Sequence, residues 1–452
     1  MVEESWQQAR LIPTSGISGA EEQERRAASA FLAVLPAVKE FGRSLLSSVG
    51  APAGAIETYV EVPFKHGEKT WRPDGLIRVT RGKRAWVGLV EVKTGKNELT
   101  VEQVEAYLDV AREQGFDALI TISNQIPPSP NQHPTAVDKR KLKKVTLHHW
   151  SWSSVVSKAI LQKEYRGVSD PDQAWILGEL IRYLEHPRSG ALEFEDMGPD
   201  WVPIREQVSA HTLRVSDKGI PGVVARWDAL LTFACLQLGR RLGTDVSLQL
   251  SRKEQADPTI RASALKASLV ENGTLTGTLR IPGTVSDVVV TANLRESKVT
   301  CHLDIEAPRT GRASTRVNWL TRQLRDAPDS LRIEAFVQNQ RGSTMADLLG
   351  KVREQPELLI SDPKKEIRSF RIAHTVSMGS KRGRGRGAFI DSVLTAIDDF
   401  YEPVVQRLKA WVPSPPRLRS EQSLGADELE TSALSSQDEP AAAPEAPART
   451  PA

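Results

Sequence analysis

Cysteine is scarce in this 452-residue sequence, and no long uninterrupted run of apolar residues occurs in it. The two cysteines, Cys235 and Cys301, lie far apart, each in an apolar or strand-like stretch. They supply neither a disulfide framework nor a cysteine-based zinc site, so we expect both to be reduced and structural. A membrane-spanning helix needs about 18 or more apolar residues in succession, so we expect no membrane partner.

The first residues also lack the features of a secretory signal, which has a basic segment followed by an apolar stretch. Glu3 and Glu4 stand where basic residues would be needed. We therefore expect a cytoplasmic protein.

A strong excess of one charge is missing as well, since the formal net charge is +3. Residues 413–452 carry seven acids and three arginines, so their net charge is −4 and that of residues 1–412 is +7. This tail is dominated by Pro, Ala, Ser and acids and is predicted to be disordered, because it cannot bury enough apolar surface. The mildly basic remainder is compatible with a polyanionic partner but does not identify one.

The length indicates two folded domains, because single domains cluster near about 100–200 residues. We assign residues 1–165 to a mixed α/β domain and residues 166–412 to an α+β domain. We assign no family to the second domain, and selection of a substrate or a partner is the role we expect for it.

Hydrophobic periodicity in the first domain predicts a leading helix, a hairpin and a strand–helix–strand unit. Ser18 and Glu21 form a capping-box pattern at the start of a helix over 19–48, which Pro36 kinks or splits. Further elements are strands at 58–64, 73–80, 85–93, 118–123 and 144–150, helices at 101–114 and 152–163, and a proline-rich loop at 125–135. The strand at 85–93 is nearly all apolar, so we expect it to be central and buried on both faces.

The same patterns predict both helices and strands in the second domain. The helices are at 171–186, 222–241, 312–325, 344–354 and 388–411, and the strands are at 244–250, 275–281, 287–294, 298–305, 331–337 and 367–377.

The residues that carry chemistry lie at the ends of two neighbouring predicted strands. Asp74 follows Pro73 at the start of one strand, and Glu91 and Lys93 end the next. In adjacent antiparallel strands these ends meet, and side-chain alternation puts Glu91 and Lys93 on the face opposite to Val92. The pattern therefore brings two carboxylates and one ammonium group together.

These groups suit the hydrolysis of a phosphodiester bond. The reaction needs a nucleophilic water and relief of negative charge on the phosphate, and a divalent ion supplies both. Magnesium prefers hard oxygen ligands, so Asp74, Glu91 and the Val92 carbonyl are the candidate ligands of Mg²⁺, with Mn²⁺ as an alternative ion. Lys93 would orient the attacking water or stabilise the developing charge.

With these residues and their flanking strands, the sequence resembles the PD-(D/E)XK nuclease superfamily over residues 19–155. The resemblance includes Gln103 and Tyr107, which are similar to the Gln-x-x-x-Tyr element of RecB-like members. It implies a restriction-endonuclease-like fold, in which helices flank a mixed central sheet. It also implies a Mg²⁺-dependent deoxyribonuclease that acts in genome defence or repair, with Gln103 and Tyr107 helping to place the substrate and the active site.

The resemblance further implies that the leading helix donates another acid to the site. Glu21, Glu22 and Glu24 on that helix and Glu61 on the first strand are the candidates. We favour Glu24, because the capping box explains Glu21 and a solvated helical face explains Glu22.

Each of these residues also has a purely structural interpretation. Asp74 favours a turn, Glu91 and Lys93 can pair as an edge salt bridge, and Gln103 and Tyr107 have the spacing of any packed helical pair. The alternative function is therefore a catalytically silent or partner-activated nucleic-acid-binding protein with a nuclease-like fold. A third hypothesis makes the second domain a sensing module, with cleavage as its output.

Two basic clusters are candidates for contact with nucleic acid. They are Lys139, Arg140, Lys141, Lys143 and Lys144 in the first domain, and Lys381, Arg382, Arg384 and Arg386 in the second. Such cations follow a phosphate backbone without reading bases, although solvated loops have the same composition. We expect DNA as the partner, with RNA as an alternative, and a homodimer or a protein bound through the second domain as further partner hypotheses. His148 and His149 have no third metal ligand in view and are predicted to be structural.

Overall fold

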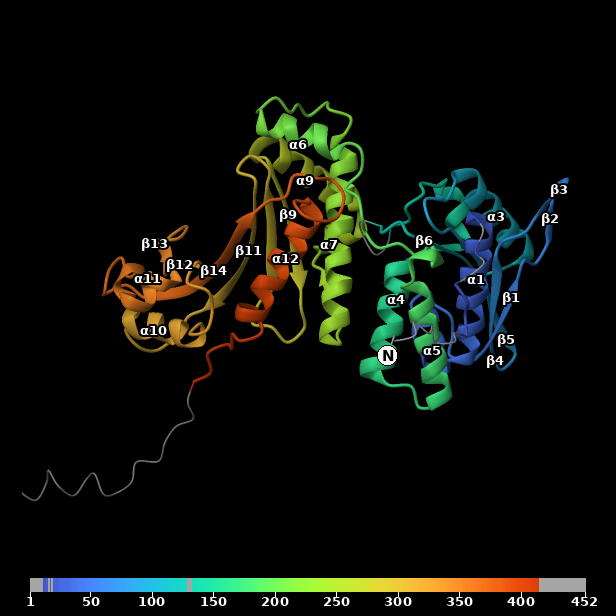
Figure 1. The fold of residues 1–452 in the computed structure, drawn as a ribbon, viewed down its shortest axis with the longest axis horizontal. Coiled ribbons are helices and arrows are strands. Elements are labelled where there is room, and N and C mark those ends of the chain that lie inside the picture. The colour runs from blue at the N-terminus through green and yellow to red at the C-terminus, as the bar shows by residue number, and fades with distance from the viewer. Residues whose placement is uncertain (1–10, 15–16, 18, 128–131, 414–452) are drawn as a thin grey trace, which may run out of the picture. The chain divides into compact units, whose positions relative to one another are not determined.

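A mixed five-stranded sheet forms the centre of the first half of the chain (Figure 1). The computed structural model describes residues 11–14, 17, 19–127 and 132–413. The strand order is β1-β4-β5-β6-β7, in which β1, β4 and β5 run antiparallel and β5, β6 and β7 run parallel. Their bounds are β1 Ala55–Val60, β4 Gly75–Arg81, β5 Arg84–Val92, β6 Ala118–Ser123 and β7 Thr146–Ser151. The predicted mixed α/β class is confirmed for this half.

Helices cover both faces of this sheet. One face packs against α1 (Ala20–Ala37), α2 (Lys39–Ser47), α4 (Trp152–Ile160) and α5 (Pro171–Leu184), and the other packs against α3 (Val101–Gln114). Val90 and Val92 of β5 belong to the first core, and Leu89 belongs to the core under α3. The strand predicted to be central is therefore buried on both faces. Because α5 shares the first core, this core extends past the predicted domain boundary at residue 165.

In the strand–helix–strand unit, α3 and β6 have the predicted bounds and β5 lies one residue earlier than predicted. The Thr100 side chain caps α3 by accepting a hydrogen bond from the Gln103 N–H (3.2 Å), and Gly115 ends the helix with a φ of 71°. A left-handed residue at a helix C-terminus favours glycine, which has no Cβ to clash. The parallel pairing of β5 with β6 follows from the helical crossover between them.

The leading helix is split in two next to Pro36. Val38 lies between α1 and α2 in an extended conformation, with φ −110° and ψ 90°. Pro36 has no N–H, so the Leu32 carbonyl one turn earlier lacks its helical donor. The Thr58 hydroxyl of β1 donates to that carbonyl oxygen instead, at 2.9 Å. The break therefore ties the helix to the first strand.

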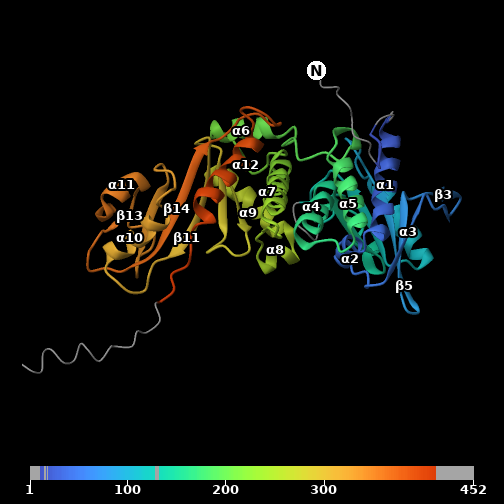
Figure 2. The same cartoon turned by 60° about the horizontal axis from the view of Figure 1, so that its bottom comes forward.

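A seven-stranded antiparallel sheet, in the order β13-β12-β14-β11-β10-β9-β8, forms the centre of the second half. Its strands are β8 Ser247–Leu248, β9 Thr274–Arg280, β10 Val288–Asn293, β11 Lys298–Glu306, β12 Arg332–Val337, β13 Met345–Leu348 and β14 Ile367–Ser377. The helices are α6 Trp201–Ser209, α7 Ile220–Leu242, α8 Arg252–Ala256, α9 Pro258–Asn272, α10 Ala313–Gln323, α11 Leu349–Glu354 and α12 Phe389–Phe400. Among them, α7, α9 and α12 contact the sheet (Figure 2).

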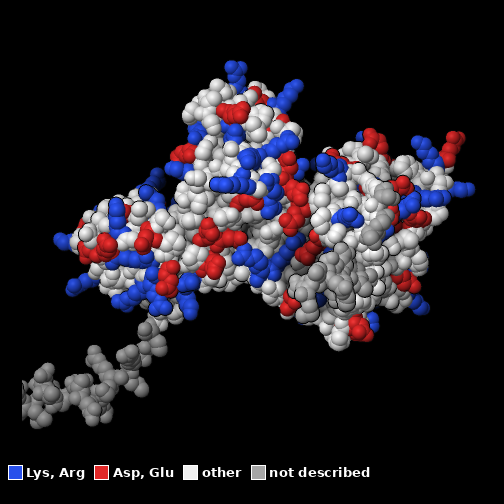
Figure 3. Space-filling model, in the orientation of Figure 1, with Lys and Arg blue, Asp and Glu red and all other residues white. Residues whose placement is uncertain are grey.

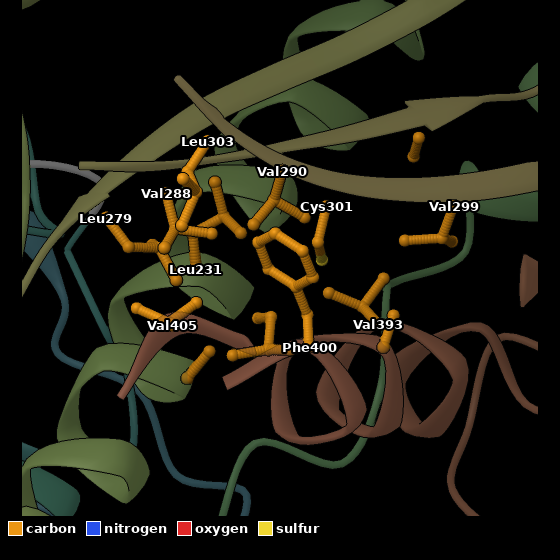
Figure 4. Packing of buried hydrophobic residues seen from close by; sticks show 14 of the residues in the cluster. Leu231, Leu279, Val288, Val290, Val299, Cys301, Leu303, Val393, Phe400 and Val405 are labelled. Atoms are coloured by element: carbon orange, nitrogen blue, oxygen red, sulfur yellow. The ribbon is translucent and has the colours of Figure 1, made fainter. Parts of the chain in front are cut away.

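The core of this half lies between one face of the sheet and its helices. Figure 4 shows Leu231 of α7, Val290 and Cys301 of the sheet and Phe400 of α12 meeting in this core. Cys301 and Cys235 are both buried in it as free thiols. Their surroundings agree with a structural role.

Several elements differ from the prediction. Residues 344–354 form β13 followed by α11 rather than one helix, because β13 pairs with β12. The hairpin of β2 (Phe64–His66) and β3 (Lys69–Trp71) was not predicted, since each strand has three residues and shows no clear alternation. The helices α6, α8 and α9 were also missed; α9 buries Leu265 and Leu269 and has a weak apolar stripe.

The start of the leading helix differs as well. α1 begins at Ala20 after Gly19, and Gly19 provides no side-chain cap. The side chain of Glu21 pairs with Arg25, and Ser18, the other residue of the predicted capping box, lies outside the described residues.

No described helix combines the length and the apolar character that a membrane crossing requires. The described residues up to Ala410 form one compact unit. The predicted disordered tail lies, from residue 414 onward, outside the described residues.

Phe31 of α1 gives a test of how the first core holds the helix. It is fully buried, and its ring meets Trp150 and Trp152 edge to face at centroid distances of 6.1 and 6.0 Å. Phe31→Ala would leave a cavity, and we expect it to lower the free energy of unfolding in urea by about 3–5 kcal/mol. Phe31→Leu keeps most of the volume and should lose clearly less. Equal losses in the two variants would contradict a cavity as the cause.

Candidate active site

The candidate site lies where β5 ends and β4 begins. The register pairs Gly75 with Val90, so Asp74, one residue before β4, lies beside Glu91. The N–H of Val92 donates a hydrogen bond of 2.6 Å to Oδ2 of Asp74. This bond fixes the first acid against the strand that carries the second.

Lys93 lies between two of the acids. Its Nζ is 2.9 Å from Oε1 of Glu91 and 3.2 Å from Oε2 of Glu24. The Glu91 residue is 2% exposed, and the side chains of Lys93 and Glu24 are 14% and 13% exposed. The structure therefore brings Asp74, Glu91, Lys93 and Glu24 into one largely buried cluster.

The other three candidate acids form ion pairs elsewhere. Glu21 and Glu61 both pair with Arg25, at 2.6 and 3.2 Å. Glu22 pairs with Arg26 at 2.6 Å. Of the four candidates, the one favoured from the sequence is thus the one that contacts the site lysine.

Gln103 and Tyr107 of α3 contact the site in different ways. The Gln103 amide donates a hydrogen bond of 2.6 Å to Oε1 of Glu91. The Tyr107 hydroxyl donates to the carbonyl oxygen of Arg72, at 3.2 Å, two residues before Asp74. Gln103 therefore orients a carboxylate, and Tyr107 orders the segment that leads into the site.

Burial dominates the electrostatics of this cluster. Burial, and then the negative charge of Asp74, raise the pKa of Glu91 to about 8, against the attraction of Lys93. Burial also raises the pKa of Asp74, although the Val92 N–H and Lys93 oppose it. Burial lowers the pKa of Lys93, but Glu91, Glu24 and Asp74 outweigh that effect, so the net shift is upward. A divalent cation would relieve the repulsion between the carboxylates.

One carboxylate oxygen of the site is orphaned. Gln103 and Lys93 both contact Oε1 of Glu91, whereas its Oε2 is buried without a hydrogen-bond partner. Such an oxygen is costly unless something binds it, and a hard cation is a suitable partner. Asp74 and Glu91 therefore fit as ligands of Mg²⁺ or Mn²⁺. In the described part of the chain, no three or more His, Cys, Asp or Glu side chains form a group that could hold a metal. A cation at Asp74 and Glu91 would therefore also need water or a main-chain oxygen, such as the predicted Val92 carbonyl, as a ligand.

The loop after β5 is held by residues that the sequence analysis did not select. The Asn97 amide donates a hydrogen bond of 2.6 Å to Oε1 of Glu24. The Gly95 N–H donates to the Gly190 carbonyl at 2.8 Å, and the Asn124 amide donates to the carbonyls of both glycines, at 2.9 and 2.8 Å. The position of Asn97 just after the Glu-x-Lys pattern was a usable signal. The other contacts join distant segments and leave no local signal.

The first basic cluster is partly neutralised. Arg140 pairs with Asp138 at 3.1 Å, and Lys141 pairs with Asp109. The remaining members, Lys139, Lys143 and Lys144, are exposed and form no ion pair with any described residue.

The second basic cluster is mostly engaged in holding its own loop. Arg382 pairs with Asp196 at 3.3 Å and Arg384 with Asp391 at 2.7 Å. The contacts of Lys381 include a hydrogen bond from its Nζ to the Arg386 carbonyl, at 3.1 Å. The described contacts of this loop do not include the carboxylate cluster. Figure 3 likewise shows basic and acidic side chains interspersed on the face that it presents.

The two adjacent histidines lie on β7, and one of them is fully hydrogen-bonded. His149 Nδ1 is 2.8 Å from the Thr121 hydroxyl, and its Nε2 donates to the Gln125 carbonyl at 2.9 Å. Thr121 also contacts Nε2 of His133 at 2.7 Å. Burial lowers the pKa of His149 to about 3. These contacts account for His149 as a neutral structural residue.

The lowered pKa of His149 gives a pH test. The unfolded chain binds a proton near the ordinary histidine pKa and the folded chain does not, so folding stability falls as pH drops from about 6.5 toward 3. We expect His149→Gln, which keeps a donor for the Gln125 carbonyl, to reduce this slope by up to about 1.4 kcal/mol per pH unit. Urea unfolding between pH 7 and 4 measures it. The exposed His211 gives the control His211→Asn, and an equal change of slope in both variants would contradict the assignment.

No protein-family model matches this chain, and no curated protein matches it either. The chemistry of the site must therefore be argued from its own side chains. Those side chains are two adjacent carboxylates, a third acid from a helix and a lysine that joins two of them.

Proposed function

We propose that the first half of the chain is a divalent-metal-dependent nuclease that hydrolyses phosphodiester bonds of DNA. The observation that carries this proposal is the buried cluster at the end of β5, in which Oε2 of Glu91 accepts no hydrogen bond and the neighbouring Asp74 carboxylate raises the pKa of Glu91. A structural salt bridge leaves this buried oxygen without a partner, whereas a bound cation would coordinate it. The resemblance of Asp74, Glu91 and Lys93 to the PD-(D/E)XK pattern supports the same conclusion.

The carboxylates of Asp74 and Glu91 would hold Mg²⁺ or Mn²⁺. The bound ion would supply charge relief at the phosphate and an activated water. Val92 orients Asp74 through its N–H, and Gln103 orients Glu91 through Oε1. Both acids are therefore positioned by contacts that leave an oxygen of Glu91 for the ion.

Lys93 would act as a cation and a donor rather than as a base. The surrounding carboxylates raise its pKa above the ordinary value, which keeps the ammonium form. Its N–H groups could then orient the attacking water or stabilise charge that develops on the phosphate. Glu24 and Asn97 would hold Lys93 in place, since Asn97 bonds the Glu24 carboxylate that contacts it.

A catalytically silent or partner-activated nucleic-acid-binding protein is the second candidate function. The ion pairs of Lys93 with Glu91 and Glu24 favour it, because they already satisfy the lysine without substrate or metal. In that case the carboxylate cluster would be a structural element. RNA is the alternative to DNA as the nucleic acid, and a protein partner or a second copy of the chain bound through the second half stays a further hypothesis.

The proposal is tested by incubating purified protein with linear, circular and single-stranded DNA and with RNA, in Mg²⁺, Mn²⁺ or EDTA. We expect cleavage of DNA that requires the metal, and a loss of about 100-fold or more in Asp74→Asn, Glu91→Gln and Lys93→Ala. Gel analysis of initial rates measures the loss.

Glu21→Gln is the matched control, since Glu21 lies on the same helix as Glu24 but is exposed and paired with Arg25. It should cleave at the wild-type rate. Thermal melts of every variant would exclude loss of fold as the cause. Absence of cleavage by folded wild-type protein with every substrate and metal would reject the nuclease and favour the silent binding protein.

A further inference from the structure

The β2–β3 hairpin is placed next to the carboxylate cluster but belongs to neither sheet. β2 and β3 pair with each other alone, and the chain leaves β3 at Trp71, three residues before Asp74. Figures 1 and 2 both show this ribbon extending away from the five-stranded sheet. A two-stranded ribbon has little stability by itself, so its contacts with the domain decide its position.

One face of the hairpin is anchored on and beside α3. The Trp71 ring meets the Tyr107 ring edge to face at 5.7 Å, and Phe64 meets Phe116 in the same way at 5.7 Å. The ring of His66 lies 2.9 Å from the Glu113 carboxylate. The aromatic residues of the ribbon are thus used to fix it to the domain.

The opposite face is cationic. Lys65 pairs with Thr70 across the hairpin, so alternation places both on the face away from α3, and Arg72 follows directly after the end of β3. All three are exposed. Within the described parts of the chain, Lys65 and Arg72 form no ion pair, unlike Arg140, Arg382 and Arg384 in the basic clusters.

We propose that the hairpin is an arm that grips the phosphate backbone of double-stranded DNA and presents the scissile phosphate to Asp74. This inference rests on the proposed nuclease function and names its substrate class. A two-stranded ribbon fits the major groove of B-form DNA, and exposed lysine, arginine and threonine side chains suit its phosphates.

The arm is better suited to a duplex than to a single strand. Binding of single strands relies on aromatic side chains that stack on bases. Phe64 and Trp71 instead contact Phe116 and Tyr107. The exposed face of the arm therefore offers contacts to phosphates and not to unstacked bases.

The spacing of the arm from the site also fits. An extended chain advances about 3.3 Å per residue, so the Cα atoms of Arg72 and Asp74 are at most about 7 Å apart. Phosphates of one DNA strand are spaced about 3.4 Å along the helix axis. The two residues are therefore close enough for neighbouring phosphates of one strand to contact both of them.

The experiment measures binding of the full chain to a fluorescein-labelled DNA duplex by anisotropy, in EDTA, over a series of KCl concentrations. Each phosphate contact contributes about 0.9 to the slope of log K against log salt concentration. Lys65→Ala/Arg72→Ala should weaken binding and reduce this slope by about 2. The charge-conserving variant Lys65→Arg/Arg72→Lys should keep most of the slope.

The matched control is Lys364→Ala/Lys365→Ala, which removes two exposed cations from the second half. Its slope should stay at the wild-type value. An unchanged slope in the arm variant, or an equal loss in the control, would overturn the proposal. Binding of single-stranded DNA or duplex RNA as tightly as duplex DNA would overturn the substrate class.

The measurement needs no cleavage, so it separates the two proposals. Loss of duplex binding in the arm variant without metal-dependent cleavage in wild type would keep the arm and reject the nuclease. Metal-dependent cleavage by the wild type, together with normal duplex binding by the arm variant, would keep the nuclease and reject the arm.

Discussion

The buried carboxylate of Glu91 is the constraint on which the rest of the site depends. At 2% exposure, its charged form is costly, and the pKa of about 8 shows that the groups around it offset only part of this cost. Lys93 supplies the charge, and Gln103 supplies a donor from α3. The lysine in turn contacts Glu24 of α1, which packs on the opposite face of the sheet from α3. One carboxylate at the end of a central strand therefore requires polar side chains from both layers of helices.

Much of this arrangement could be predicted from sequence, because its causes are local. The apolar run of β5 predicts a strand buried on both faces, and Thr100 and Gly115 mark the ends of α3 by ordinary capping chemistry. Side-chain alternation then places Glu91 and Lys93 on one face. The preference for Glu24 followed from assigning the neighbouring acids other roles. In the structure Glu21 and Glu22 each form an ion pair with an arginine one turn away, a role that was not predicted for Glu21.

The features that could not be predicted depend on contacts between distant segments, which leave no periodic signal in the sequence. The loop after Lys93 is bonded to Gly190, almost a hundred residues later, with Asn124 bridging the two. Gly190 has a φ of 78°, and a Cβ there would meet the Gln23 side chain at 2.6 Å and Thr94 at 2.8 Å. Whether a basic side chain is free to bind an anionic ligand also depends on distant segments, because an acid from elsewhere in the chain can pair with it. The basic clusters were conspicuous in sequence, yet Arg382 is paired with an acid far away along the chain.

The helix α3 contacts both the hairpin and Glu91, the acid proposed to bind the metal. Tyr107 contacts the Trp71 ring and bonds the Arg72 carbonyl, while Gln103, one turn earlier on α3, bonds Glu91. The hairpin and the Glu91 carboxylate are therefore connected through one turn of α3 rather than through a flexible loop. Packed helices move as units. The distance between a phosphate bound at the arm and the carboxylate of Glu91 would therefore vary little. If the proposed nuclease is correct, this link would fix the distance between the backbone contact and the position of hydrolysis.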